Sequence, residues 1–241
     1  YNLLKMTDEN RQAFLRRLLD PVNGMGMSLM RVTVGTSDFT AQDFYTYYDG
    51  TGKELDGKPD WNNVTGKGFS IQKDKDLGII KVINEMQAIA KELGVEDNLK
   101  FFASSWTPPG WMKLPTSSSN SYEDNELLLK GGKLNDDYID DLAKYMVRYV
   151  EEYQKCGIPI YAMTIQNEPL LEINYPSCAM TGTQEAKIAK AIKAELAKST
   201  VLKDNEKEVK LWAFDHNFDG ADKFMADFFK EAGDQLNIDG I

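Results

Sequence analysis

Apolar residues recur along this chain with two alternating patterns, one typical of amphipathic helices and one typical of buried strands. Thr7 can cap a first helix, whose apolar face carries Phe14, Leu15, Leu18 and Leu19. Apolar runs at residues 28–34, 99–104, 160–166 and 209–214 predict strands. Further helices are predicted near residues 79–93, 138–153, 183–196 and 224–229. Asn135 can cap the helix near 138–153, and Thr183 can cap the helix near 183–196. Strand and helix alternate, which is typical of an α/β fold with a parallel sheet.

The connections between these elements are unequal in length. Long polar segments follow the strands, at residues 35–72, 105–134 and 167–182, whereas short connections follow the helices. In a (β/α)8 barrel the loops after the strands build the active site, and a doubly wound sheet also places ligands at strand ends. No G-x-G-x-x-G turn follows the first strand, which weakens a dinucleotide-binding interpretation. Residues 238–241 are expected to begin a fifth strand, and no interdomain linker is evident.

Composition narrows the possible partners. The 241 residues are 42% hydrophobic, enough for one sizeable core, and we expect a single domain over residues 1–241. A formal net charge of -10 repels phosphate backbones, so we expect no nucleic-acid partner. No apolar run is long enough to predict a transmembrane segment, and no signal peptide is visible at Tyr1, although one on a longer precursor would not be seen here.

The segment Asn167-Glu168-Pro169 closes the third predicted strand. Pro169 disfavours helical geometry at Glu168, so we expect an extended backbone that projects the carboxyl group from the strand end. Hydrolysis of a glycosidic bond needs a carboxylic acid beside the leaving oxygen, and Asn167 could hydrogen-bond a neighbouring sugar hydroxyl. The same tripeptide is also compatible with a simple turn. The tripeptide alone leaves both interpretations open.

Polar and aromatic residues at the other strand ends favour the chemical interpretation. Residues 101–113 end a strand with Trp106, Trp111 and a stiffened turn, and indole faces suit the C–H faces of sugar rings. Arg31 lies in mid-strand and, if buried, needs an anionic partner, which a catalytic carboxylate or a structural salt bridge would supply. Asp38 and Asp215 follow the first and fourth strands. His216 is the only histidine, so neither a histidine metal site nor a Ser-His triad is expected.

Taken in order, these segments resemble glycoside hydrolase family 30, the glucosylceramidase and β-1,6-glucanase group. The resemblance rests on residues 31–39, 104–113, 164–169 and 215–217 and on Tyr175-Pro176, and it covers nearly the whole chain. It implies a (β/α)8 TIM barrel, retention of configuration, and neither metal nor cofactor. By the same resemblance Glu168 is the catalytic acid/base, Asn167 binds the sugar beside it, Asp38, Trp106 and Asp215 line the glycone pocket, and Arg31 supports the catalytic carboxylates.

The chain also departs from the family pattern. Retaining hydrolysis needs two carboxylates about 5–5.5 Å apart, and the family's nucleophile is a glutamate on a later strand. No glutamate here matches its motif, Glu172 and Glu185 included. We count about four full strands and the start of another, whereas a closed barrel has eight. We therefore expect the nucleophile and the remainder of the barrel to come from flanking sequence, and this chain alone to be inactive.

Substrate and compartment follow only from the resemblance. It implies a β-linked glucoside or glucan, such as a glucosylceramide-like lipid or β-1,6-glucan, and a secreted or lysosomal protein. The strand ends at 166–170 and 215–217 lean slightly towards the glucanases. Two alternatives remain: a non-catalytic carbohydrate-binding barrel, and an unrelated barrel enzyme that shares Asn-Glu-Pro by convergence, against which the tryptophan-containing loop argues.

Overall fold

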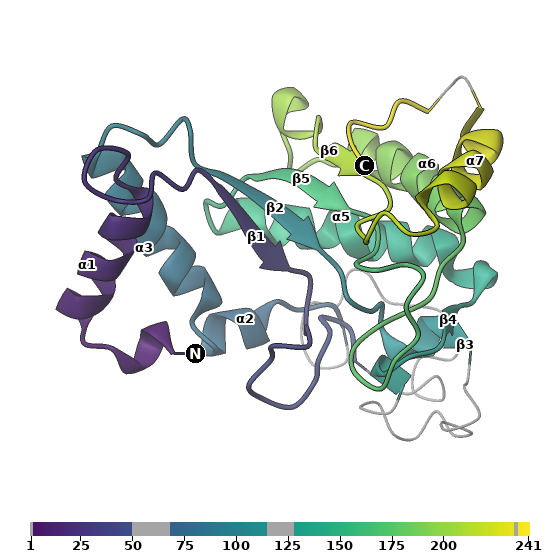
Figure 1. Ribbon diagram of the computed structural model, residues 1–241, viewed down its shortest axis with the longest axis horizontal. Coiled ribbons are helices and arrows are strands. Elements are labelled where there is room, and N and C mark those ends of the chain that lie inside the picture. Colours follow the sequence, from purple (N-terminus) through teal and green to yellow (C-terminus); the bar gives the residue numbers. More distant parts are fainter. Residues whose placement is uncertain (1, 50–67, 115–127, 234–235) are drawn as a thin grey trace.

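A four-stranded parallel sheet forms the centre of the molecule in the computed structural model, which describes residues 2–49, 68–114, 128–233 and 236–241 (Figure 1). The strands are β1 (Leu29–Thr33), β2 (Lys100–Ser104), β5 (Ile160–Thr164) and β6 (Lys210–Trp212). They pair in the order β1-β2-β5-β6, and every pairing is parallel. The predicted α/β class and all four predicted strands are confirmed.

The C-terminal residues extend this sheet beyond β6. Gly240 forms a parallel bridge with Trp212, and the amides of Ala213 and Asp239 donate to the carbonyl oxygens of Gly240 and Leu211 at 3.0 and 2.9 Å. The carboxyl end of the chain accordingly lies beside β6 in Figure 1. Of the further strand predicted near residues 238–241, the structure shows one parallel bridge at Gly240 rather than a strand.

Helices follow the strands, as the periodicity predicted. They are α1 (Asp8–Leu19), the short α2 (Gln72–Asp76), α3 (Ile79–Glu92), α5 (Ile139–Lys155), α6 (Gly182–Lys198) and α7 (Ala221–Ala232). Thr7 caps α1 by accepting from the Asn10 amide, as expected. The expected cap at Thr183 is wrong: Thr181 caps α6, because Thr181 and Gln184 form a reciprocal capping box that satisfies two free amides. Asn135 caps a 3-10 turn, Asp136–Tyr138, that leads into α5.

The segment after β2 is more ordered than the long loop predicted from its composition. A 3-10 turn, Gly110–Met112, leads into β3 (Lys113–Leu114), which pairs antiparallel with β4 (Lys133–Leu134). Strands of two residues are too short for an alternating pattern to be seen in the sequence. The intervening part of the predicted loop, residues 115–127, and residues 50–67 of the loop after β1 lie outside the described residues.

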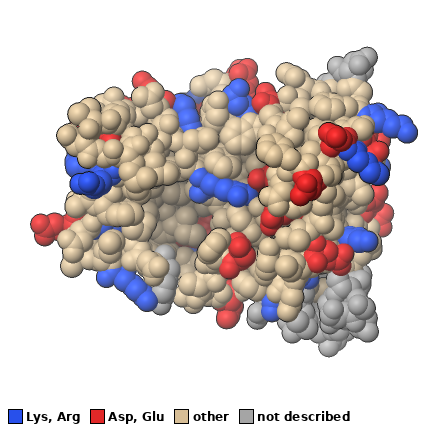
Figure 2. Space-filling model, viewed as in Figure 1, with Lys and Arg blue, Asp and Glu red and all other residues tan. Residues whose placement is uncertain are grey.

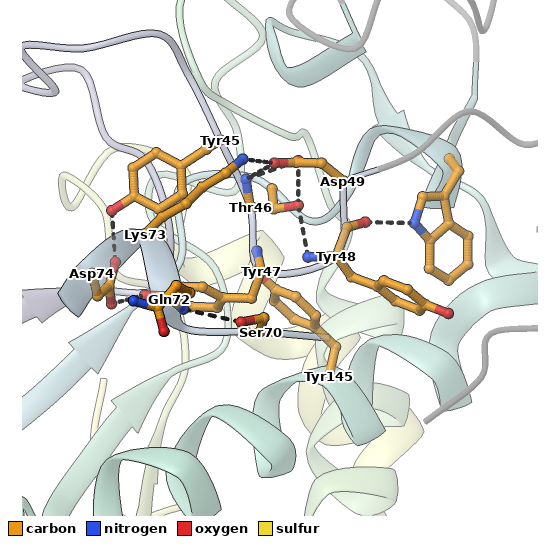
Figure 3. Close-up of polar contacts among 11 residues, drawn as sticks. Tyr45, Thr46, Tyr47, Tyr48, Asp49, Ser70, Gln72, Lys73, Asp74 and Tyr145 are labelled. Atoms are coloured by element: carbon orange, nitrogen blue, oxygen red, sulfur yellow. Dashed lines mark hydrogen bonds and ion pairs between the residues drawn. The ribbon is translucent and has the colours of Figure 1, made fainter. Parts of the chain in front are cut away.

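The segment after β1 is fastened to the core by a buried carboxylate. Asp74 of α2 accepts hydrogen bonds from the hydroxyls of Tyr45 (2.7 Å), Tyr47 (2.5 Å) and Tyr153 (2.6 Å), the last from α5. Figure 3 shows the Tyr45 hydroxyl directed at Asp74. Burial raises the pKa of Asp74, while the three hydroxyls act in the opposite direction. These bonds join the stretch that carries Asp38 to α2 and α5.

Charged residues are scattered over the surface. On the face seen in Figure 2, Lys and Arg stand apart from one another among Asp, Glu and a larger area of uncharged residues. Within the described ranges, no helix is both long and apolar enough to cross a bilayer.

Candidate active site

The carboxyl ends of the parallel strands are joined to one another by backbone hydrogen bonds. The amide of Asn167, after β5, donates to the carbonyl oxygen of Ser105, after β2, at 2.7 Å. The next amide, that of Glu168, donates to the carbonyl oxygen of Asp215, after β6, at 2.8 Å. Three strand ends are therefore held in fixed positions, and the residues predicted from separate loops lie at one edge of the sheet.

The backbone at Glu168 corrects one expectation from the sequence. Glu168 is not extended but has a φ of 48°, in the left-handed region. Pro169 disfavours helical geometry, but it does not fix the preceding residue. Here the bond from the Glu168 amide to Asp215 and a 2.8 Å bond from the Leu171 amide to the Glu168 carbonyl oxygen impose a turn. A non-glycine residue in this region is strained, and such strain gathers at functional sites.

Arg31 joins the predicted residues into a network. Its Nη2 donates to Asp215 Oδ2 (2.6 Å), Ser104 Oγ (2.7 Å) and Asn167 Oδ1 (2.8 Å). The anionic partner expected for this arginine is thus Asp215. The premise of a buried arginine is wrong, because 36% of the Arg31 side chain is exposed on the open face of the sheet. The bond to Asn167 Oδ1 fixes that amide so that its Nδ2 remains as the donor.

The hydroxyl groups of Ser104 and Thr164 complete the network around Arg31 and Asp215. Ser104 Oγ donates to Asp215 Oδ2 at 2.7 Å and accepts from Thr164 Oγ1 at 2.7 Å. Asp215 Oδ2 therefore accepts from both Arg31 and Ser104, which hold the carboxylate in one orientation. Charge-assisted bonds of this kind are about twice as strong as neutral ones.

The two tryptophans have different roles. Trp106 packs against Arg31, whose guanidinium carbon lies 4.5 Å from a ring centre of the indole. Gln166 Nε2 donates to the Trp106 carbonyl oxygen at 2.7 Å, which ties this loop to the end of β5. Trp111 is buried and donates its indole N–H to the Tyr48 carbonyl oxygen at 3.0 Å. Trp106 thus forms part of the site wall, whereas Trp111 supports the loop from within.

Three further side chains surround the Glu168 carboxyl group. His216 Nδ1 lies 3.8 Å from Glu168 Oε1 and has no hydrogen-bond partner among the described residues. Burial raises the pKa of Tyr175, and the nearby charges of Glu168 and Asp38 and a hydrogen bond to Glu168 add to this effect. The structure thus brings both Asp38 and Glu168 close enough to Tyr175 for their charges to act on it.

Sequence reasoning had not assigned roles to Tyr175 and His216 beside Glu168. Tyr175 was noted only as part of a motif, and His216 as the single histidine and as part of the motif at residues 215–217. Both residues lie in segments that follow strand ends, and this position was the sequence feature that could have indicated a role in the site. Between them, a carboxyl group, a phenol and an imidazole provide groups that can hold or transfer a proton next to a hydroxyl-rich ligand. In the described parts of the chain, no cluster of three His, Cys, Asp or Glu residues could hold a metal ion.

Comparison with known proteins decides the family. The model of the glycosyl hydrolase family 30 TIM-barrel domain matches residues 1–234. This chain belongs to glycosyl hydrolase family 30. Its parallel sheet and helices are accordingly part of a TIM barrel, and the strand ends described above lie on the face where such barrels place their active sites.

Similar proteins with assigned names include endo-1,6-β-glucanases and glucosylceramidases. The chain is 30% identical over 213 residues to the endo-1,6-β-D-glucanase neg1 of Aspergillus fumigatus, covering 86% of the chain and 39% of that protein. It is 26% identical over 186 residues to the lysosomal acid glucosylceramidase of Mus musculus, covering 76% of the chain and 32% of that protein. The chain thus spans less than half the length of the relatives it matches.

A solved structure agrees with this relationship. The endo-β1,6-glucanase BT3312 superposes with a TM-score of 0.77 at 28% identity, over 100% of this chain and 48% of that one. The family 30 assignment and the barrel fold suggested by the sequence motifs are confirmed.

Proposed function

We propose that the protein carrying this chain is a retaining β-glycoside hydrolase in which Glu168 is the general acid/base. The observation that carries the proposal is the position of Glu168 just after β5, where its amide binds Asp215 and where Asn167 and Asp215 both bind Arg31. Glu168 is one-third exposed, so a substrate can reach its carboxyl group, while its backbone is held by two hydrogen bonds.

The chemistry proceeds in two steps. Glu168 first donates its proton to the glycosidic oxygen as that bond breaks, and a glutamate on a later strand forms the covalent glycosyl-enzyme. Glu168, now a carboxylate, then removes a proton from the water that attacks this intermediate. Asn167 Nδ2, Asp38 and Asp215 bind hydroxyls of the sugar, and Trp106 closes one side of its pocket.

β-1,6-Glucan is our first choice of substrate. Two endo-1,6-β-glucanases, from Aspergillus fumigatus and Trichoderma harzianum, are each 30% identical over more than 210 residues, and the superposed solved structure is also named an endo-β1,6-glucanase. Glucosylceramide-like lipids are the second choice, because the glucosylceramidases match either at lower identity or over shorter stretches than these glucanases. We also propose an extracellular or lysosomal location, which fractionation of the source cells tests.

Glu168→Gln in the full-length protein tests the acid/base assignment. The amide cannot protonate a poor leaving group, so we expect kcat/KM on β-1,6-linked oligosaccharides to fall by about 100- to 10,000-fold. An aryl β-glucoside with an activated leaving group needs little protonation, so the first step should be affected far less. Glu172→Gln, four residues further along and exposed, is the matched control and should leave both rates unchanged.

Two outcomes would contradict the proposal. Unchanged kinetics of Glu168→Gln on both substrates would remove Glu168 from the mechanism. Wild-type protein that binds β-glucans without cleaving any β-glucoside would favour the carbohydrate-binding alternative.

A further inference from the structure

Glu185 is a buried carboxyl group that the proposed mechanism does not use. It lies in the first turn of α6, its exposed fraction is 0%, and it sits behind the end of β6 rather than in the open site. Its Oε2 accepts a hydrogen bond from the Phe214 amide at 3.1 Å, while its Oε1 has no hydrogen-bond partner in the described part of the chain. Burying a glutamate without a cationic partner costs free energy, so a specific structural role is expected for it.

The group that Glu185 binds is the start of an unusual turn. Phe214 has a φ of 52°, and Glu168 is the only other non-glycine residue with positive φ among those described. The Phe214 carbonyl oxygen accepts from the His216 amide at 2.7 Å, and its buried ring packs against Phe224 of α7 with ring centres 4.9 Å apart. Without Glu185 the Phe214 amide would be left unpaired in this apolar setting.

This turn determines where two groups of the site lie. The residue after Phe214 is Asp215, whose carbonyl oxygen accepts from the Glu168 amide and whose carboxylate accepts from Arg31. From this chain of contacts we infer that Glu185 is a positioning residue, which holds the Phe214 turn and thereby sets Asp215 and Glu168 in place. The inference rests on the proposed function of Glu168, although the contacts themselves do not.

The protonation state of Glu185 suits this role. Burial raises the pKa of its carboxyl group to about 8, the amide of Phe214 acts against this, and the charge of Asp215 adds to it. At neutral pH the group is therefore mainly a neutral acid that still offers an acceptor oxygen. Glutamine has the same shape, the same acceptor and no charge, so it should replace Glu185, whereas leucine keeps similar bulk and offers no acceptor.

The test compares Glu185→Gln and Glu185→Leu in the full-length protein. Amide hydrogen exchange is measured on peptides covering 164–171 and 211–217, and kcat and KM are measured on an activated aryl β-glucoside. We expect Glu185→Gln to stay within about threefold of wild type in both. Glu185→Leu should raise exchange about tenfold or more in those two peptides, leave β2 protected, and lower kcat/KM about 10- to 100-fold.

A matched control uses the same helix. Glu195→Leu removes a carboxylate whose partner is Lys198 on the outer side of α6, and it should change neither exchange at the strand ends nor kinetics. If Glu185→Leu does not fold, Glu185→Asp keeps a polar group but withdraws it from Phe214, and it should show the same local rise in exchange.

Three results would overturn the inference: wild-type exchange at both strand ends in Glu185→Leu and Glu185→Asp, a rise spread evenly over the whole sheet, or equal damage from glutamine and leucine. Failure of the proposed function is distinguishable. A wild-type protein that cleaves no β-glucoside would refute that function, and the exchange comparison would still decide whether Glu185 holds the turn.

Discussion

The Glu168 amide donates to the Asp215 carbonyl oxygen at 2.8 Å, so the ends of β5 and β6 are joined at the residue that we propose as the acid/base. Glu168 has a φ of 48°, and the residue before Asp215 has a φ of 52°. Strained backbone costs on the order of 1–3 kcal/mol at each position and persists where the surroundings hold it. Here the two strained residues, Glu168 and Phe214, lie at the ends of neighbouring strands, and the bond from Glu168 to Asp215, the residue after Phe214, joins the two turns.

Asp215→Asn should weaken catalysis much more than folding. The change removes the charge that faces Arg31 and Ser104 and so weakens the charge-assisted bonds that orient this side chain. We expect kcat/KM on β-glucosides to fall about 10- to 100-fold. The free energy of unfolding should fall by less than about 1 kcal/mol, because both partners are partly exposed. Steady-state kinetics and thermal unfolding measure the two effects.

The control for this change is Asp219→Asn, an exposed carboxylate four residues further along. It should leave both quantities at their wild-type values. A large loss of stability in Asp215→Asn with little loss of turnover would show that the Arg31 network serves the fold rather than the site.

Tyr175→Phe should affect substrates that need protonation. The phenol lies close enough to the Glu168 carboxyl group for the charge of that group to act on it, and its removal takes away a polar neighbour that helps to orient that group. We expect kcat/KM on β-1,6-linked oligosaccharides to fall about tenfold, with a smaller effect on an activated aryl glucoside. Tyr161→Phe, on the partly exposed face of β5, is the control. Equal losses on both substrates would instead assign Tyr175 to binding.

The fold could be predicted from the sequence wherever an element was long enough for the periodic spacing of its apolar residues to be recognised. The four strands of the sheet follow from mainly apolar runs, and the helices between them from apolar residues at helical spacing. The ribbon of β3 and β4 could not be predicted, because each strand has two residues and is held by its partner. The cap of α6 was predictable in principle: Thr181 and Gln184 have the T-x-x-Q spacing of a capping box, but Thr183 lies nearer the apolar run.

The sequence allowed the residues of the site to be named, but it did not allow their mutual contacts to be predicted. Asn-Glu-Pro, Asp215 and Arg31 are visible as polar residues at strand ends. That Arg31 pairs with Asp215, which lies 184 positions away, depends on strand order, which the sequence alone does not give. Glu185 was noted only as a poor match to the nucleophile. Its burial behind β6 follows from the packing of α6, and no local pattern indicates it.

The tyrosine cluster around Asp74 should make the protein sensitive to alkaline pH. Burial raises the pKa of Tyr45, Tyr47, Tyr145, Tyr149 and Tyr153 above the ordinary value of 10.0. A raised folded pKa means that the stability from these groups is complete below pH about 10 and is lost as pH rises further, because unfolded tyrosines ionise first. Thermal unfolding measured from pH about 9 to about 11 should show a steep fall.

Removal of one hydroxyl checks the origin of that fall. Tyr153→Phe deletes one of the three donors to Asp74, so it should lower the free energy of unfolding by about 1–2 kcal/mol at neutral pH and make the alkaline fall less steep. Tyr161→Phe should leave the slope unchanged. A fall of unchanged slope in Tyr153→Phe would place its origin outside the cluster.

Stability should also depend on pH through Glu185. Its pKa is about 8 in the folded protein, against a reference value of 4.5, so between these values the folded chain holds a proton that the unfolded chain has released. Stability from this group therefore falls as pH rises from about 4.5 to about 8, by on the order of 5 kcal/mol. Glutamine does not titrate, so Glu185→Gln should gain stability relative to wild type across this window and level off above it. Denaturant unfolding at several pH values measures the free energy of unfolding of both proteins. In the control Glu195→Gln, this free energy should vary with pH as it does in wild type. A difference between Glu185→Gln and wild type that stays constant with pH would show that Glu185 is ionised in the fold, held by more than the single Phe214 amide.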